Sequence, residues 1–276
     1  MRTRTITAIV GAIIIAPFLV FFDTYAGAAL IQIAGVICTY ELLNATGLKK
    51  KWFLAVPLYI LALGLPLLVY FKENENFFRY SAVIFFLLSI YMLTVSVFSK
   101  GKIQVDNTSV LFTMSFYVLM SLNCLYLLRT EEQGALLYML PLVTSWSTDI
   151  FAYFSGRLFG RHKLIPDVSP KKTVEGAVGG FVCSVGITVL YGLLMKIFFE
   201  ASPNYLNLII AGTLMSIASM AGDLIASLVK RHYGIKDYGW LLPGHGGALD
   251  RIDSVLAAAP RLMILHELPM GFALFR

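Results

Sequence analysis

Long apolar segments separated by short polar ones run through the whole chain. A helix needs roughly 20 consecutive apolar residues to cross a hydrocarbon layer of about 30 Å, and about nine stretches approach that length. They cover approximately Ile6–Phe22, Ala28–Ala45, Trp52–Phe71, Tyr80–Phe98, Val110–Leu128, Leu136–Phe159, Ala177–Phe199, Leu206–Val229 and Ile252–Phe275. The pattern predicts an all-α polytopic integral membrane protein with about nine transmembrane helices.

Composition supports a membrane protein. Of the 276 residues, 58% are hydrophobic and only 14% are charged, which leaves too little polar surface for a soluble globule of this size. The net charge of +6 does not indicate nucleic-acid binding, because the cations flank apolar segments, where topology and anionic head groups account for them. Cys38, Cys124 and Cys183 lie in separate apolar segments without CxxC spacing, so neither a disulfide framework nor a zinc site is expected.

Lysine and arginine are concentrated in alternate loops. One set of loops, with Arg2 and Arg4, holds Lys49, Lys50, Lys51, Lys100, Lys102, Arg157, Arg161, Lys163, Lys171, Lys172, Lys230, Arg231, Lys236 and Arg251. The opposite set holds Lys72, Arg79, Arg129, Lys196 and Arg276. Because positively charged loops stay in the cytoplasm, we expect a cytoplasmic N-terminus and an external C-terminus. The first apolar window lacks a convincing cleavage site, so it is expected to be retained as a span.

Ionisable residues are also unevenly distributed among the apolar segments. Glu41 is the main one in the early spans, whereas the later spans contain Asp149, Asp223, Asp250, Asp253 and Arg261. We therefore expect residues 1–134 to be a transmembrane scaffold of about five helices. Residues 135–204 would supply middle helices with a cytoplasmic SPKKT loop, and 205–276 the catalytic helices.

Three aspartates near the eighth and ninth spans could hold a metal. Asp223 lies inside a span, where a carboxylate costs roughly 2.5 kcal/mol or more without a partner. Asp250 and Asp253 are three residues apart and so lie on one helix face. Oxygen donors in this arrangement suit Mg²⁺. The alternatives are an ion-pair ladder from Asp223 through Ser227 to Lys230 and Arg231, and helix capping by Asp250 with Asp253 near the positive helix end.

A glycine-rich stretch separates these two helices. Gly244, Gly246 and Gly247 surround His245 and allow backbone conformations closed to other residues. Backbone N–H groups just before a helix can bind phosphate oxygens, although the same glycines would suit a tight turn. His245 by itself is more often a polar loop residue than a catalytic one.

A second polar cluster extends from Ser145 to Glu175. Asp149 and Tyr153 are one helical turn apart, and Gly156 and Gly160 form a small-residue face typical of helix packing. The run Ser169–Pro170–Lys171–Lys172–Thr173 then enters the seventh helix near Gly176. It could cradle a polyphosphate, or its lysines could serve only to set topology.

The segment 227–253 resembles the signature of phosphatidate cytidylyltransferases, also called CDP-diacylglycerol synthases. The matching positions are Ser227, Lys230, Arg231, Lys236, Asp237, Pro243, His245, Gly246, Gly247, Asp250, Arg251 and Asp253. Asp149, Tyr153 and the SPKKTVEG stretch resemble the second motif set of that family, and the multi-span layout is similar throughout. Ala248 stands where the family usually has a larger aliphatic residue, a change of little expected consequence. The tail from Arg261 also departs from the family pattern, so the extent and packing of the last helix are not predicted.

The resemblance implies transfer of the cytidylyl group of CTP to phosphatidate, giving CDP-diacylglycerol and pyrophosphate. It implies Mg²⁺ at Asp223, Asp250 and Asp253, with K⁺ as a candidate second cation. Phosphates would be held by Lys230, Arg231, Lys236 and Arg251, with help from Gly246 and Gly247, while Lys171 and Lys172 close over the triphosphate. Asp237 and His245 would be site residues without an assigned role, and the substrate-binding set would include Ser227, Ser169, Thr173, Asp149 and Tyr153.

Other functions compatible with this chain are a CTP-dependent polyprenol or lipid kinase and an ion or phosphate transporter. The transporter is disfavoured because the ionisable residues gather near the cytoplasmic ends and no inverted repeat is evident. The family also implies a homodimer in the bacterial cytoplasmic (inner) membrane, with the active site facing the cytoplasm. The expected partners are CTP, phosphatidate and membrane lipids, with no nucleic acid.

Overall fold

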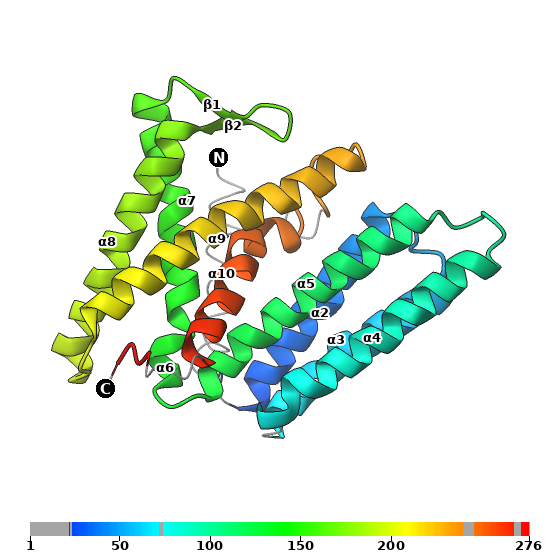
Figure 1. The fold of residues 1–276 in the computed structure, drawn as a ribbon, viewed down its shortest axis with the longest axis horizontal. Helices are drawn as coiled ribbons and strands as arrows, with labels where there is room; N and C mark the ends of the chain where they lie inside the picture. The colour runs from blue at the N-terminus through cyan, green and yellow to red at the C-terminus, as the bar shows by residue number, and fades with distance from the viewer. Residues whose placement is uncertain (1–21, 23, 72–73, 240–245, 268–271, 276) are drawn as a thin grey trace. The chain divides into compact units, whose positions relative to one another are not determined.

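The computed structural model describes residues 22, 24–71, 74–239, 246–267 and 272–275. The chain forms two compact units, each built from two separate segments. Unit 1 comprises Met1–Thr130 with Tyr233–Arg251, and unit 2 comprises Glu131–His232 with Ile252–Arg276. Figure 1 shows that nearly all of the described chain is helical, which confirms the expected all-α class.

Unit 1 is a bundle of long apolar helices. They are α2 (Tyr25–Ala45), α3 (Trp52–Tyr70), α4 (Asn74–Phe98) and α5 (Val105–Thr130). Helix α2 packs against α3 and α5, and α4 packs against α3 and α5, so neighbouring helices bury each other's apolar side chains. The Thr24 hydroxyl caps α2 by accepting a hydrogen bond of 3.2 Å from the N–H of Ala26.

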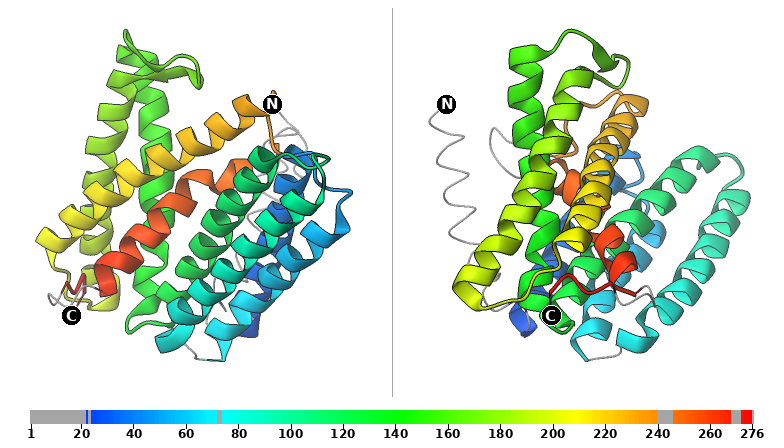
Figure 2. Two further views of the ribbon diagram at one scale, coloured as in Figure 1. Left: turned by 45° about the vertical axis from the view of Figure 1, so that its right-hand side comes forward. Right: turned by 60° about the vertical axis from the view of Figure 1, so that its left-hand side comes forward.

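Unit 2 contains a short hairpin in addition to its helices. Its elements are α6 (Gly134–Leu137), α7 (Met139–Phe159), β1 (Lys163–Ile165), β2 (Ser169–Thr173), α8 (Val174–Phe199), α9 (Tyr205–His232) and most of α10 (Leu249–Glu267). Figure 2 shows α7 and α8 side by side, with the β1–β2 hairpin joining their ends and α9 running obliquely along them. The first residues of α10, up to Arg251, belong to unit 1.

Seven described helices are long and apolar enough to span a membrane. They correspond to the second through eighth predicted windows. Most of the first window, Ile6–Phe22, falls outside the described residues. The last window overlaps α10, which begins three residues earlier, is not among the seven and carries Asp250, Arg251, Asp253, Arg261 and Glu267. The polytopic fold is thus confirmed, while the number of nine spans and the orientation stay predictions.

Glycines bring α7 and α8 unusually close. A Cβ atom on Gly180 would lie 2.7 Å from the carbonyl oxygen of Thr148, and one on Gly176 would lie 2.7 Å from that of Ala152. Neither distance is tolerable, so both positions require glycine. Gly156 faces the same contact, because its Cβ would lie 3.5 Å from the Cα of Gly176. Helix packing within one chain therefore accounts for the small residues at this end of α7.

Buried hydroxyl groups join the same helices deeper in unit 2. The hydroxyls of Thr144 and Thr188 are 2.9 Å apart, and those of Thr148 and Ser216 are 3.1 Å apart. These side chains are fully buried, where an unpaired hydroxyl would be costly. The two hydrogen bonds fix α7 against α8 and α9, and Asp149 follows Thr148 directly on α7.

Candidate active site

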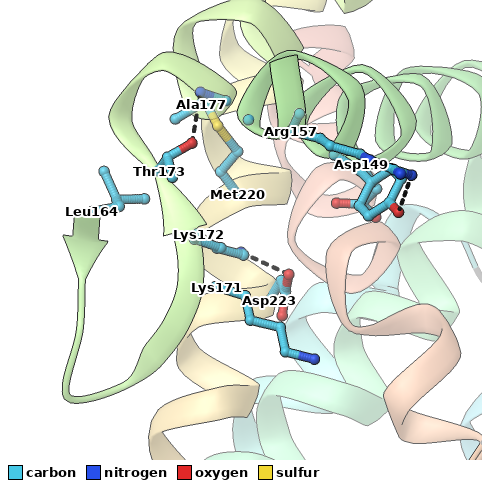
Figure 3. Close-up of a pocket in the computed structure, with 13 residues that line it drawn as sticks. Asp149, Arg157, Leu164, Lys171, Lys172, Thr173, Ala177, Met220 and Asp223 are labelled. Atoms are coloured by element: carbon cyan, nitrogen blue, oxygen red, sulfur yellow. Dashed lines mark hydrogen bonds and ion pairs between the residues drawn. The ribbon is translucent and has the colours of Figure 1, made fainter. Parts of the chain in front are cut away.

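Unit 2 contains a cavity of about 350 Å³ at the end of its helices that carries the hairpin. Helices α7, α8 and α9 and the β1–β2 hairpin all contribute to its wall (Figure 3). The wall consists of Asp149, Ala152, Tyr153, Gly156, Arg157, Leu164, Lys171, Lys172, Thr173, Gly176, Ala177, Met220 and Asp223. Three cations and two carboxylates therefore face one mainly apolar chamber, a charge pattern suited to an anionic ligand bound with a cation.

Asp223 is paired across the cavity with the hairpin. The Lys172 ammonium lies 2.6 Å from Oδ2 of Asp223, and each side chain is 27% exposed. Figure 3 shows Lys172 reaching from β2 directly to this carboxylate on α9. The Ser227 hydroxyl, one turn further along α9, donates to Oδ1 at 3.3 Å. These partners offset the cost of a carboxylate within a span, and they join two motifs that are distant in the sequence.

Asp149 and Asp253 approach each other through Ser254. The Ser254 hydroxyl donates to Oδ2 of Asp149 at 2.9 Å, and its backbone N–H donates to Oδ1 of Asp253 at 2.9 Å. Asp253 is only 9% exposed, and its charge interacts with those of Asp223, Asp149 and Lys230. The structure thus gathers three of the expected site carboxylates, from α7, α9 and α10, within unit 2.

The SPKKT stretch is a strand rather than a loop. Strand β2 pairs antiparallel with β1, with Lys163 opposite Thr173 and Ile165 opposite Ser169. Lys171, Lys172 and Thr173 line the cavity, whereas Ser169 is not part of its wall. The Thr173 hydroxyl also caps α8 by accepting from the N–H of Gly176 at 3.1 Å. Because Lys171 and Lys172 lie on a strand, their backbone forms one regular edge of the cavity.

Arg157 and Glu175 have roles that their sequence context did not suggest. Arg157 lines the cavity, and its Nη1 donates to the Tyr153 hydroxyl at 3.4 Å. Glu175 accepts a hydrogen bond from the backbone N–H of Arg161 at 3.1 Å and from that of His162 at 3.2 Å. Its Oε1 also lies 2.6 Å from Nδ1 of His162, so it secures the turn from α7 into β1. The spacing of Asp149, Tyr153 and Arg157, four residues each, could have identified Arg157 as part of this helix face.

The signature segment in unit 1 is held by two carboxylates. Oδ2 of Asp250 accepts from the N–H groups of Tyr238 at 2.8 Å and Gly247 at 3.0 Å. Glu41 of α2 accepts from the N–H groups of Ala248 and Leu249, both at 2.8 Å. Asp250 therefore binds the backbone that leads into α10, and the Gly247 N–H that we expected to face phosphate donates to this carboxylate.

Gly246 requires glycine for its conformation. Its φ is +87°, a left-handed value that other residues rarely adopt. A Cβ there would also lie 3.2 Å from Oδ2 of Asp250 and 3.3 Å from Cβ of Asp237. Asp237 thus lies beside the glycine turn, which explains its place in the signature without assigning it a chemical role.

The remaining cations of the signature lie at the end of α9 or among the exposed residues of unit 1. The Arg231 Nε donates to the carbonyl oxygen of Val168 at 3.3 Å, which joins the end of α9 to the hairpin. Lys230 is 9% exposed, whereas Lys236 and Arg251 are exposed residues of unit 1. His245 lies outside the described residues, so its place in the site stays a prediction.

A metal was expected at the aspartates Asp223, Asp250 and Asp253, and that expectation stays a prediction. Carboxylate oxygens from Asp223 and Asp253 are the hard donors that Mg²⁺ prefers. Among the described residues, however, no three His, Cys, Asp or Glu side chains are arranged to hold a metal ion. The Lys172 ammonium occupies one oxygen of Asp223, and Asp250 bonds to backbone N–H groups. The donor chemistry fits Mg²⁺, and Lys172 and Ser227 already contact the two oxygens of Asp223.

Comparison with known proteins supplies the family. The model of the cytidylyltransferase family matches residues 2–268 of this chain. The chain belongs to the cytidylyltransferase family. The matched range includes every element of both units up to the end of α10, so the family relation extends to both the cavity and the signature segment.

Individual members of the cytidylyltransferase family are similar over nearly their whole length. The phosphatidate cytidylyltransferase of Staphylococcus saprophyticus is 34% identical over 272 residues, covering 96% of this chain and 98% of the relative. Those of Staphylococcus epidermidis and Staphylococcus aureus are also 34% identical, over 269 and 266 residues, with the same coverage. The resemblance read from the signature residues is thereby confirmed.

Proposed function

We propose that this protein transfers the cytidylyl group of CTP to phosphatidate, giving CDP-diacylglycerol and pyrophosphate. The observation that carries the proposal is the cavity of unit 2, where Lys171, Lys172 and Arg157 face Asp223 and Asp149 among membrane-spanning helices. The names of the relatives, which cover 96% of the chain, supply the substrates. A lipid phosphate and a nucleotide are the anions that such a cavity would accept.

The chemistry requires no nucleophile from the protein. A phosphate oxygen of phosphatidate attacks the α-phosphorus of CTP, a new P–O bond forms, and the bond to the β-phosphate oxygen breaks to release pyrophosphate. Both reactants are anions, so the main barrier to their meeting is electrostatic repulsion. Lys171, Lys172 and Arg157 would bind phosphate oxygens, while Lys230 lies near Asp253 at the base of the same unit. Charge neutralisation and orientation would then account for most of the rate enhancement.

Mg²⁺ belongs to the proposal as a cofactor. Asp223 and Asp253 of unit 2 would hold it, and Asp250 stays a ligand expected from the sequence alone. When bound, the ion would neutralise phosphate charge and orient the triphosphate. The present pairing of Lys172 with Asp223 is consistent with a lysine that transfers to the triphosphate when nucleotide and metal bind.

The membrane setting assigns a route to each substrate. Phosphatidate would enter laterally between helices from the bilayer, and CTP would arrive from the cytoplasm. The positive-inside distribution supports a cytoplasmic location for the hairpin and the signature segment, and we infer the bacterial inner membrane as their setting. A homodimer is part of the proposal, on the family resemblance alone, because the glycines at Gly156, Gly176 and Gly180 are used within one chain.

The test is pyrophosphate release by the purified protein in detergent with CTP, phosphatidate and Mg²⁺. We expect release that depends on the lipid and is lost, by roughly 100-fold or more, in Asp223→Asn, because the variant weakens both the metal ligand and the Lys172 pair. Glu132→Gln, which changes an exposed carboxylate, is the matched control. Release of CDP instead of pyrophosphate would indicate a lipid kinase, and cation flux into proteoliposomes without nucleotide would indicate a transporter.

A further inference from the structure

Glu41 is a buried carboxylate that the cavity of unit 2 does not explain. It lies near the end of α2 and is only 2% exposed. A carboxylate in apolar surroundings requires strong hydrogen-bond donors or a cation. The hydrogen-bond donors around Glu41 therefore indicate its structural role.

The donors come from the start of α10, more than 200 residues further along the chain. Oε1 of Glu41 accepts from the N–H of Ala248 and Oε2 accepts from the N–H of Leu249, both at 2.8 Å. N–H groups at the start of a helix have no partner within the helix, and they form its positive end. Both oxygens of one carboxylate thus satisfy the first turn of the helix that carries Asp250, Arg251 and Asp253.

Two glycines allow the backbone to approach this carboxylate. A Cβ on Gly239 or on Gly247 would lie 2.5 Å from Oε1 of Glu41, which is too short for any real contact. Gly239 precedes residues 240–245 and Gly247 follows them closely. The backbone on both sides of that stretch therefore lies against one side chain. Asp250 also links the backbone before and after that stretch, because its carboxylate accepts from the N–H groups of Tyr238 and Gly247.

We propose that Glu41 is a positioning residue for the signature segment of this enzyme. By binding the first turn of α10 and lying against Gly239 and Gly247, it fixes the start of the helix that carries Asp250, Arg251 and Asp253. Its role in catalysis rests on the proposed function, whereas its hold on the backbone does not. Glu41 acts through backbone N–H groups, so its loss should reduce turnover rather than substrate affinity.

Amide hydrogen exchange of the full-length protein in detergent tests the hold on the backbone directly. In Glu41→Gln, an amide nitrogen replaces one accepting oxygen, so we expect exchange in peptides covering 246–252 to rise at least about 10-fold. Peptides from α5 should be unchanged, and Glu132→Gln should leave both regions unchanged. Unaltered exchange at 246–252 in a folded Glu41→Gln protein would overturn the inference, whatever reaction the protein catalyses.

Kinetics test the catalytic part. For Glu41→Gln we expect kcat to fall roughly 10- to 100-fold, with KM for CTP and for phosphatidate within about twofold of the original values. Faster exchange with unchanged kcat would overturn the positioning role. If the unsubstituted protein released no pyrophosphate, the proposed function would fail, while the exchange result would still decide whether Glu41 holds the segment.

A pair of substitutions provides a second test if Glu41→Gln does not fold. Gly247→Ala should slow turnover because its methyl group meets Glu41, and Glu41→Asp shortens the side chain and removes that conflict. The double variant should therefore lose less activity than the product of the two single losses predicts. Gly64→Ala, which has no heavy atom within 4 Å of the added methyl group, is the matched control. Independent effects of the two substitutions would contradict a direct contact between these residues.

Discussion

Lys172 is the residue whose contact most directly joins the two motif sets of unit 2. We expect Lys172→Gln to lower kcat/KM for CTP by at least roughly 10-fold, because the ammonium would no longer pair with Asp223 or bind the triphosphate. Its effect on unfolding should be small, about 0 to 1 kcal/mol, since a partly exposed ion pair contributes little. Steady-state kinetics and thermal melting in detergent measure the two effects.

The same hairpin supplies the control for that prediction. Lys163 lies on β1, is exposed and does not line the cavity, so Lys163→Gln should leave kcat/KM unchanged. Equal losses in the two variants would mean that only the overall positive charge of the hairpin matters.

Single site residues could be predicted from the sequence to different degrees. Asp223 was identifiable because a carboxylate inside an apolar segment is costly, whereas Lys172 lay in a polar run that could equally have served only to set topology. The contact between them was not predictable, because it depends on how β2 folds over α9. Glu41 was noticed as a charged group in an early span, but its partners lie 207 and 208 residues away, a separation that no local pattern reports.

At the scale of elements, the contact between α7 and α8 gives a prediction about packing. Gly180→Ala should destabilise the protein by about 1 to 3 kcal/mol, because its Cβ would lie 2.7 Å from the Thr148 carbonyl oxygen and force the helices apart. Gly186→Ala on the same helix adds a methyl group with no heavy atom within 4 Å. Its melting temperature should be unchanged or slightly raised. Similar melting temperatures for the two variants would show that the helices separate at no cost.

Helices were the elements most easily predicted, because apolar runs of this length have few other stable structures in a membrane. The β1–β2 hairpin was missed. Its strands contain three and five residues, and the sequence SPKKT has neither the β-branched enrichment nor the alternation that identifies strands. Pairing with β1 and the Thr173 cap on α8 determine its structure, and both depend on how α7 ends.

For the whole molecule, the two units show why the signature segment could not be placed from sequence order. The division that makes residues 205–276 one catalytic segment stays a prediction, and within the fold Tyr233–Arg251 packs in the same compact unit as Met1–Thr130. The hydrogen bonds of Glu41 to Ala248 and Leu249 join the start of α10 to α2 within this unit. Early helices therefore do more than form a scaffold, because one of them holds part of the signature.

Membrane topology is the prediction that concerns the entire chain. The distribution of lysine and arginine predicts that the turn between α4 and α5 lies in the cytoplasm and the turn between α8 and α9 lies outside. In a chain whose cysteines are replaced by alanine, we expect Lys102→Cys to resist a membrane-impermeant maleimide in intact cells and to react after permeabilisation. Glu200→Cys should react in intact cells, and both positions are exposed. The reverse pattern would place the hairpin and the signature segment outside, away from cytoplasmic CTP, and would contradict the proposed reaction as well as the orientation.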